Sequence, residues 1–126
     1  MIQYVSTKRR DPRDSSNPQK YYACASSRGT VDLRGIARKI SAQSTLTTVD
    51  TFAVLEAFIQ LIPQELADGK IVQLGEFGSF RVTLRSEGAD TAEELNSHAI
   101  KEVMVRFRQG TEFKRLFSNP TFEKAS

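Results

Sequence analysis

The sequence predicts an α+β protein, and three patterns support that prediction. Two segments within residues 31–68 place apolar side chains every three or four positions, which is the period of an amphipathic helix. Short apolar runs and an alternation of apolar with polar residues, bounded by glycines, are typical of strands. These patterns occur in residues 71–85 and 103–108. Residues 111–117 return to helical spacing. Two helices, three strands and a short C-terminal helix are therefore expected in that order.

The first helix is expected over residues 31–43. Its apolar positions follow one another at i, i+3, i+4 and i+7, and they are Leu33, Ile36, Ala37 and Ile40. Thr30 can cap the start of this helix, and Asp32 stands near the positive end of its dipole. A single amphipathic helix follows from this pattern.

The second helix is expected from Thr47 to Asp68, with two apolar stripes. Thr47 and Asp50 have the spacing of a capping box, and Asp68-Gly69 has the form of a left-handed stop. One stripe holds Phe52, Leu55, Ile59, Ile62 and Leu66, and the other holds Val54, Phe58 and Leu61. Because the core of a 126-residue chain covers only one stripe, we expect the other to bury against a second copy. The predicted dimer interface is Phe52, Leu55, Phe58, Ile59 and Ile62.

Strands are expected at 71–74 and 79–84, joined through Gly75-Glu76-Phe77-Gly78. Glycines at both ends of this turn indicate left-handed backbone, a bulge, or a close approach to the main chain. A polar and acidic excursion over residues 86–102 leads to a third strand, 103–108. Gly110 breaks this strand before the short helix.

Residues 1–29 form a basic extension ahead of the main domain, residues 30–126. Two β-prone segments, IQYVS and KYYACA, flank the polar stretch TKRRDPRDSSNPQ, which indicates an extra β-hairpin or a partly ordered tail. Residues 1–40 hold nine lysines and arginines against three aspartates, a net charge of +6, whereas the remainder has −3. We expect the N-terminal third to supply much of the attraction for any polyanion.

Several classes of function are not expected. No segment approaches the roughly 18 apolar residues of a membrane span, and the first residues lack the order of a signal peptide, so we expect a cytoplasmic protein. Cys24 and His98 are the only cysteine and histidine, which disfavours a disulfide or a metal site. The sequence shows no nucleophile-histidine-aspartate pattern and no P-loop lysine. We therefore expect no enzyme activity, no cofactor, no metal and no small-molecule substrate.

The order and spacing of these motifs resemble the HU/IHF family of bacterial DNA-architectural proteins over residues 30–117. VQLGEFGSFRV is similar to the family's strand-turn-strand with its GFGTF-type turn, and VRFRQGTEFK is similar to its FxPGxxLK segment. The resemblance implies an intertwined homodimer whose three-stranded antiparallel sheets form a saddle with two β-arms around duplex DNA. It also implies a nucleoid-associated, histone-like role through phosphate contacts with little sequence specificity.

The resemblance also implies which residues contact DNA. Gly78 and Ser79 match the family's turn, and Arg85 matches an arginine at the base of the arm. The basic segment after the third strand is matched by Arg108, Gly110 and Lys114. Three further basic residues are expected near the same saddle: Arg81, Lys101 and Arg106.

The excursion departs from the family's arm, which is basic and carries a proline at its tip. Here the segment from Arg85 to Val103 has no proline, and Lys101 stands among Glu87, Asp90, Glu93, Glu94 and Glu102. Thr83 replaces a usual arm arginine, and Gln109 replaces the proline of the FxPG segment.

Two hypotheses follow from these departures. The N-terminal extension would supply the missing phosphate contacts through Lys8, Arg9, Arg10 and Arg13. Alternatively, the dimer fold serves as a protein-interaction or structural module with weak or no DNA binding. Arginines 81, 85, 106 and 108 on one face would favour DNA, whereas pairing with Glu87, Glu94 and Glu102 would favour the module.

Overall fold

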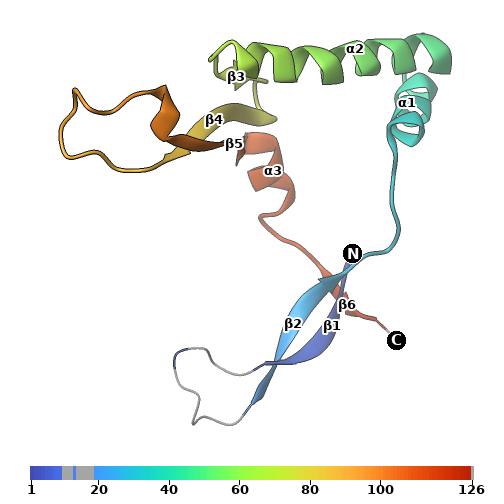
Figure 1. Cartoon of the computed structure of the whole chain (residues 1–126). Helices are drawn as coiled ribbons and strands as arrows, with labels where there is room; N and C mark the ends of the chain where they lie inside the picture. The colour runs from blue at the N-terminus through green and yellow to red at the C-terminus, as the bar shows by residue number, and fades with distance from the viewer. Residues whose placement is uncertain (10–12, 14–18, 126) are drawn as a thin grey trace. The chain divides into compact units, whose positions relative to one another are not determined.

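The computed structural model describes residues 1–9, 13 and 19–125, and the chain divides into two compact units (Figure 1). Unit 1 comprises Met1–Asp32 together with Leu116–Ser126, and unit 2 comprises Leu33–Arg115. Unit 2 holds two long helices and a small sheet, and unit 1 holds a second small sheet. The predicted mixed α+β class is confirmed.

Unit 2 begins with α1 (Leu33–Ala42) and α2 (Thr48–Ala67), which pack against each other. The predicted caps of α2 are present. The side chain of Thr47 accepts a hydrogen bond from the Asp50 N–H at 3.1 Å, and Gly69 follows the helix with φ +81°. The start of α1 differs from the prediction, because the backbone from Gly29 (φ +133°) to residue 32 is irregular, which leaves Thr30 outside the helix.

The sheet of unit 2 is antiparallel with the order β3-β4-β5. Its strands are β3 (Val72–Gln73), β4 (Gly78–Ser86) and β5 (Ile100–Gln109). Figure 1 shows β4 and β5 running as a ribbon into a projecting loop, which ends with the 3-10 turn η1 (Ser97–Ala99). The short helix α3 (Thr111–Leu116) follows β5. The ribbon is longer than the sequence predicts, because the Glu87 N–H donates to the Ala99 carbonyl at 2.8 Å beyond a shift of register at Arg85/Ser86.

One face of the ribbon is apolar and lies against the end of α2. Cross-strand partners on this face are Phe80 with Phe107, Val82 with Val105, and Leu84 with Val103. Together with α2 they line a groove of about 370 Å³, whose residues are Ile62, Pro63, Leu66, Ala67, Phe80, Val82, Val103 and Val105. Val103 and Val105 are 61% and 59% exposed, so this chain alone leaves the groove partly open.

The two stripes of α2 differ in burial, with the exception of Ile59 in the first stripe. In the first stripe Leu66 is buried and Phe52, Leu55 and Ile62 are half-buried, with the Arg34 guanidinium 4.8 Å from the centre of the Phe52 ring. In the second stripe all three members are exposed: Val54 63%, Phe58 44% and Leu61 54%. Ile59 is exposed as well, which adds to the uncovered apolar surface.

Unit 1 is a three-stranded sheet with the order β2-β1-β6. The predicted hairpin is present, because β1 (Ile2–Arg9) pairs antiparallel with β2 (Lys20–Ser26). A third strand that no sequence pattern predicts, β6 (Phe122–Lys124), pairs parallel to β1. Two hydrogen bonds flank that pairing, from the Ile2 N–H to the Thr121 carbonyl at 3.0 Å and from the Ala125 N–H to the Tyr4 carbonyl at 2.9 Å.

Candidate nucleic-acid interface

The strand register of β4 and β5 places four arginines on one face of the ribbon. Residues directly opposite each other in an antiparallel pair share a face, and alternate residues of a strand share it too. The opposed pairs on this face are Ser79 with Arg108, Arg81 with Arg106, Thr83 with Met104, and Arg85 with Glu102. We call the set Arg81, Arg85, Arg106 and Arg108 the arginine face; all four side chains are exposed.

Arg81 and Arg106 stand directly opposite each other on neighbouring strands. Like charges in that position destabilise a sheet, so this pairing does not contribute to the stability of the isolated chain. An anion lying across both strands would offset the repulsion, since guanidinium groups hydrogen-bond phosphate and carboxylate oxygens in pairs. The register therefore favours an anionic partner on this face.

The ion pairs of the ribbon lie at its far end. The Lys101 Nζ is 2.9 Å from a carboxylate oxygen of Glu87, and an Arg85 Nη is 3.9 Å from one of Glu102. Among the residues that the structure describes, Arg81, Arg106 and Arg108 form no ion pair. One Arg106 nitrogen lies 3.7 Å from the Met104 sulfur. Positive charge is thus uncompensated at the end of the ribbon beside the glycine turn (residues 75–78) and compensated toward the projecting loop.

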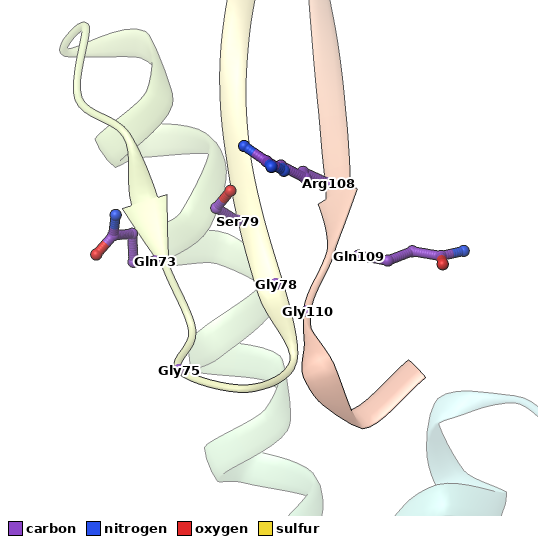
Figure 2. A pocket seen from close by; sticks show the side chains of 7 residues that line it. All are labelled: Gln73, Gly75, Gly78, Ser79, Arg108, Gln109 and Gly110. Atoms are coloured by element: carbon purple, nitrogen blue, oxygen red, sulfur yellow. The ribbon is translucent and has the colours of Figure 1, made fainter. Parts of the chain in front are cut away.

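A cavity of about 310 Å³ opens on the arginine face, at the end of the ribbon beside the glycine turn. It is lined by Gln73, Gly75, Gly78, Ser79, Arg108, Gln109 and Gly110. Figure 2 shows the Arg108 side chain extending from β5 toward the Ser79 side chain on β4, whereas the side chains of Gln73 and Gln109 point away on either side. A guanidinium and a hydroxyl therefore converge beside a glycine-lined surface, which is a suitable arrangement for an oxygen anion.

The two central glycines of this cavity are required by the close approach of backbone segments. A Cβ at Gly78, where φ is +144°, would overlap the Arg108 carbonyl oxygen and lie 2.8 Å from the Phe107 ring. A Cβ at Gly110 would overlap the Glu76 carbonyl and lie 2.8 Å from the Gly78 nitrogen. The Gly110 N–H donates to the Phe77 carbonyl at 2.9 Å, which holds the turn against the end of β5. Of the alternatives raised by the sequence, left-handed backbone and close approach are both observed.

Four phenylalanines support this corner of unit 2. Phe77 lies 5.5 Å from Phe107 and 5.1 Å from Phe113 between ring centres, and Phe107 lies 4.8 Å from Phe80 and 5.7 Å from Phe113. These separations are typical of tilted and edge-to-face aromatic pairs. The cluster joins the turn, β4, β5 and α3, and so holds the glycines and Arg108 in place.

The remaining predicted contact residues lie apart from this cavity. Lys114 is exposed on α3, and Lys101 is engaged with Glu87 at the other end of the ribbon. Lys8 and Arg9 end strand β1 in unit 1, and Arg13 is exposed in the segment that follows. Arg10 lies outside the described residues. Gln73 lines the cavity although no local pattern predicts it, because its place there depends on the pairing of β3 with β4 at Gln73 and Ser79.

Two carboxylate contacts shift pKa values outside this interface. A hydrogen bond from Arg115, 2.8 Å away, lowers the pKa of Glu112 in α3, and the charge of Arg115 adds to the effect. A hydrogen bond to Glu65, 3.1 Å away, raises the pKa of Lys70 after α2. Both contacts are exposed ion pairs, one at the end of α2 and one in α3. Neither involves a residue of the arginine face.

The described residues contain no group of three or more His, Cys, Asp or Glu side chains able to hold a metal ion. Nor does any described helix combine the length and apolar character that crossing a membrane requires. The guanidinium groups of the arginine face supply hydrogen-bond donors and positive charge.

Comparison with known protein families identifies the family of this chain. A family profile described as "HU domain fused to wHTH, Ig, or Glycine-rich motif" matches residues 1–124. The chain belongs to the HU-HIG family. No curated protein sequence matches this HU-HIG chain.

Solved structures show the same fold. The HU-HIG chain is similar to a candidate bacterial DNA-binding protein from Bacteroides vulgatus, with 11% identity and a TM-score of 0.67 over 98% of this chain and 47% of that one. It is also similar to HU from Anabaena in a cocrystal with DNA, with 19% identity and a TM-score of 0.55 over 71% of this chain and 99% of that one. The chain thus spans about half the length of the Bacteroides vulgatus protein.

Proposed function

We propose that this HU-HIG protein binds duplex DNA through phosphate contacts on the arginine face. It acts without catalysis, as an architectural and nucleoid-associated protein with little sequence specificity. The observation that carries the proposal is the arrangement of Arg81, Arg106 and Arg108, three exposed arginines on one sheet face with no ion pair among the described residues. The HU domain of the family and the Anabaena HU–DNA cocrystal support this assignment.

The physics of the arginine face favours phosphate over base recognition. Guanidinium groups match the geometry of phosphate oxygens, and contacts to the DNA backbone position a protein without reading its sequence. Ser79 offers a hydroxyl beside Arg108 for the same phosphate (Figure 2). The predicted contacts of Gly78, Gly110, Lys101 and Lys114 belong to this proposal as well. Gly78 and Gly110 would act indirectly, because they permit the close backbone approach that shapes the cavity beside Ser79 and Arg108.

We expect the affinity for duplex DNA to fall steeply with salt. Binding of phosphate groups releases condensed counterions, so log K declines with log salt by roughly 0.9 per phosphate contacted. Three arginines from each subunit of a dimer would give a slope of roughly −5. Fluorescence-anisotropy titrations of a labelled duplex of about 30 base pairs at several salt concentrations measure this slope. Absence of binding at low salt, from an intact dimer, would contradict the proposal.

The proposed assembly is a homodimer built on the apolar surface of unit 2. The second stripe of α2 and the groove between α2 and the ribbon are both uncovered in a single chain. Apolar surface of this extent on one side of a helix and one side of a sheet requires a partner. A second copy is favoured because it would cover the exposed surface of one α2, which is the second stripe together with Ile59, with the same surface of the other, as two-fold symmetry demands.

An acidic residue within the predicted interface is expected to separate the subunits. In the Ile59→Glu variant a charge would be buried against the partner helix without a compensating group, which costs several kcal/mol. Size-exclusion chromatography with light scattering should show a monomer or unfolded chain. The matched control is Val49→Glu, since Val49 is 76% exposed and lies in neither stripe of the same helix. A dimeric Ile59→Glu protein would rule out this interface.

The ion pairs at the far end of the ribbon support a second candidate function. Glu87 and Glu102 lie against Lys101 and Arg85, which removes two of the cations expected near DNA. In a protein-interaction or structural module with the same dimer fold, these ion pairs would not impair function, because such a module does not need free cations for DNA. The duplex titration distinguishes the two functions, because the module requires an intact dimer that does not respond to DNA.

A further inference from the structure

The hairpin of unit 1 carries positive charge at one end and no acidic residue in either of its strands. Strands β1 and β2 together contain three charged residues, which are Lys8, Arg9 and Lys20. The antiparallel register brings the end of β1 beside the start of β2, so Lys8 pairs with Tyr21 and Arg9 pairs with Lys20. All three cations therefore gather at the end of the hairpin that faces its connecting segment. We call Lys8, Arg9, Lys20, Tyr21 and Tyr22 the hairpin end.

Arg9 and Lys20 repeat the unusual feature of the arginine face. They are cations placed directly opposite each other on neighbouring strands, an arrangement that costs stability unless an anion lies between them. The charged groups of Lys8 and Arg9 make only weak contacts with the described residues. One Arg9 nitrogen is 3.4 Å from the Cys24 sulfur, and the Lys8 Nζ is 5.9 Å from the centre of the Tyr21 ring. Since a guanidinium has five N–H donors, Arg9 retains donors for a phosphate.

Two exposed tyrosines accompany these cations. Tyr21 is 69% exposed and Tyr22 is 44% exposed, and as consecutive strand residues they lie on opposite faces of the hairpin. Each phenol hydroxyl can donate to a phosphate oxygen, and tyrosine is among the side chains that make such contacts. Cations with an aromatic donor on each face suit a ribbon that enters a groove and meets both strands of a duplex.

We propose that the hairpin end is a second surface of this protein for the phosphate backbone of duplex DNA. The inference rests on the proposed function and extends it to unit 1. The two ribbons of the chain differ in the charge at their ends. The far end of β4–β5 carries Lys101 and Arg85 compensated by Glu87 and Glu102, whereas the strands of the hairpin carry cations alone. The hairpin thus offers the basic ribbon end that the β4–β5 arm does not.

A charge-neutral variant of the full chain tests this inference. The variant Lys8→Gln/Arg9→Gln/Lys20→Gln is titrated against the labelled duplex of about 30 base pairs used for the wild type. We expect the affinity at low salt to fall at least about tenfold and the salt slope to lose about 2 to 3 per contacting chain. The matched control Arg38→Gln/Lys39→Gln/Lys124→Gln removes the same charge from exposed positions elsewhere and should change the affinity by less than about threefold.

The outcomes separate the inference from the proposed function. If the wild type binds with a steep salt slope and the hairpin variant matches the control, the hairpin does not contact DNA while the proposed function stands. If the wild type does not bind at low salt, both fail. The variant is also tested on vesicles containing phosphatidylserine. Loss of vesicle binding with unchanged DNA affinity would assign the hairpin to a membrane surface and overturn the inference.

A second measurement reports on the hairpin end without neutralising it. The chain contains no tryptophan, so Tyr21→Trp introduces a single fluorophore at that position. We expect unlabelled duplex to change its emission and to protect it from acrylamide quenching over the concentration range in which anisotropy reports binding. Unchanged quenching on a DNA-bound protein would show that the hairpin end stays exposed to solvent and would overturn the inference.

Discussion

The Gly110→Ala variant is expected to lose about 3 kcal/mol of folding free energy, at the upper end of the cost of overpacking. The added methyl group would overlap the Glu76 carbonyl and lie 2.6 Å from its carbon. Both obstacles are backbone atoms of the glycine turn, so no side-chain rotation can relieve the clash. The turn must instead move away from β5 and give up the hydrogen bond between the Gly110 N–H and the Phe77 carbonyl.

Urea denaturation at a fixed protein concentration measures this loss, since the stability of the proposed dimer would depend on concentration. Gly88→Ala is the matched control. No atom lies within 4 Å of a Cβ at Gly88, and its backbone is outside the left-handed region, so a change within about 0.5 kcal/mol is expected. Equal stability of the two variants would show that the turn does not press against β5 as the structure describes.

The Arg106→Gln/Arg108→Gln variant, which removes two arginines from each subunit of the proposed dimer, is expected to bind duplex DNA at least about 100-fold more weakly at low salt. A charge-assisted hydrogen bond to a phosphate contributes about 1.5 kcal/mol or more, which is roughly tenfold in affinity for each arginine. The salt slope should also lose about 1 for each phosphate contact removed from a subunit. Stability should not fall, because the change relieves the repulsion between Arg81 and Arg106.

The control for this variant is Arg38→Gln/Lys39→Gln, which removes two exposed cations from α1. A converse change tests the same electrostatics: Glu87→Gln/Glu102→Gln releases Lys101 and Arg85 from their carboxylates and is expected to tighten DNA binding severalfold. If the arginine variant binds as tightly as its control while the wild type binds DNA, the contacts lie elsewhere on the chain.

Local signals in the sequence were sufficient to predict the elements of unit 2. The cap at Thr47 and the glycine after α2 act within four residues of the helix ends, and the hydrophobic period of α2 covers nearly six turns. The sequence predicts the start of α1 two residues too early, because Thr30 can cap the helix only if the backbone after Gly29 turns helical, and it does not. Strand β6 has three residues and is formed by a distant partner, so no local pattern revealed it.

The candidate site was predictable in composition but not in charge balance. The arginines of the ribbon were identified individually, yet their common face depends on a register that places Arg81 opposite Arg106. The sequence named Glu87, Glu94 and Glu102 as alternative partners for them. In the described residues Glu87 pairs with Lys101 and Glu102 with Arg85, and Glu94 forms no ion pair. The register shift at Arg85/Ser86 and the conformation of the loop determine these pairings, and no local sequence pattern predicts either of them.

The parallel pairing of β1 with β6 constrains the order in which the chain can fold. Ile2 faces Phe122 across this ladder, so the contact spans roughly 120 residues and its closure entropy is high. During synthesis the hairpin can form early from neighbouring residues, but its third strand must wait until the segment after α3 has left the ribosome. The sheet of unit 1 is thus completed late, and until then β1 presents an unpaired edge to other chains.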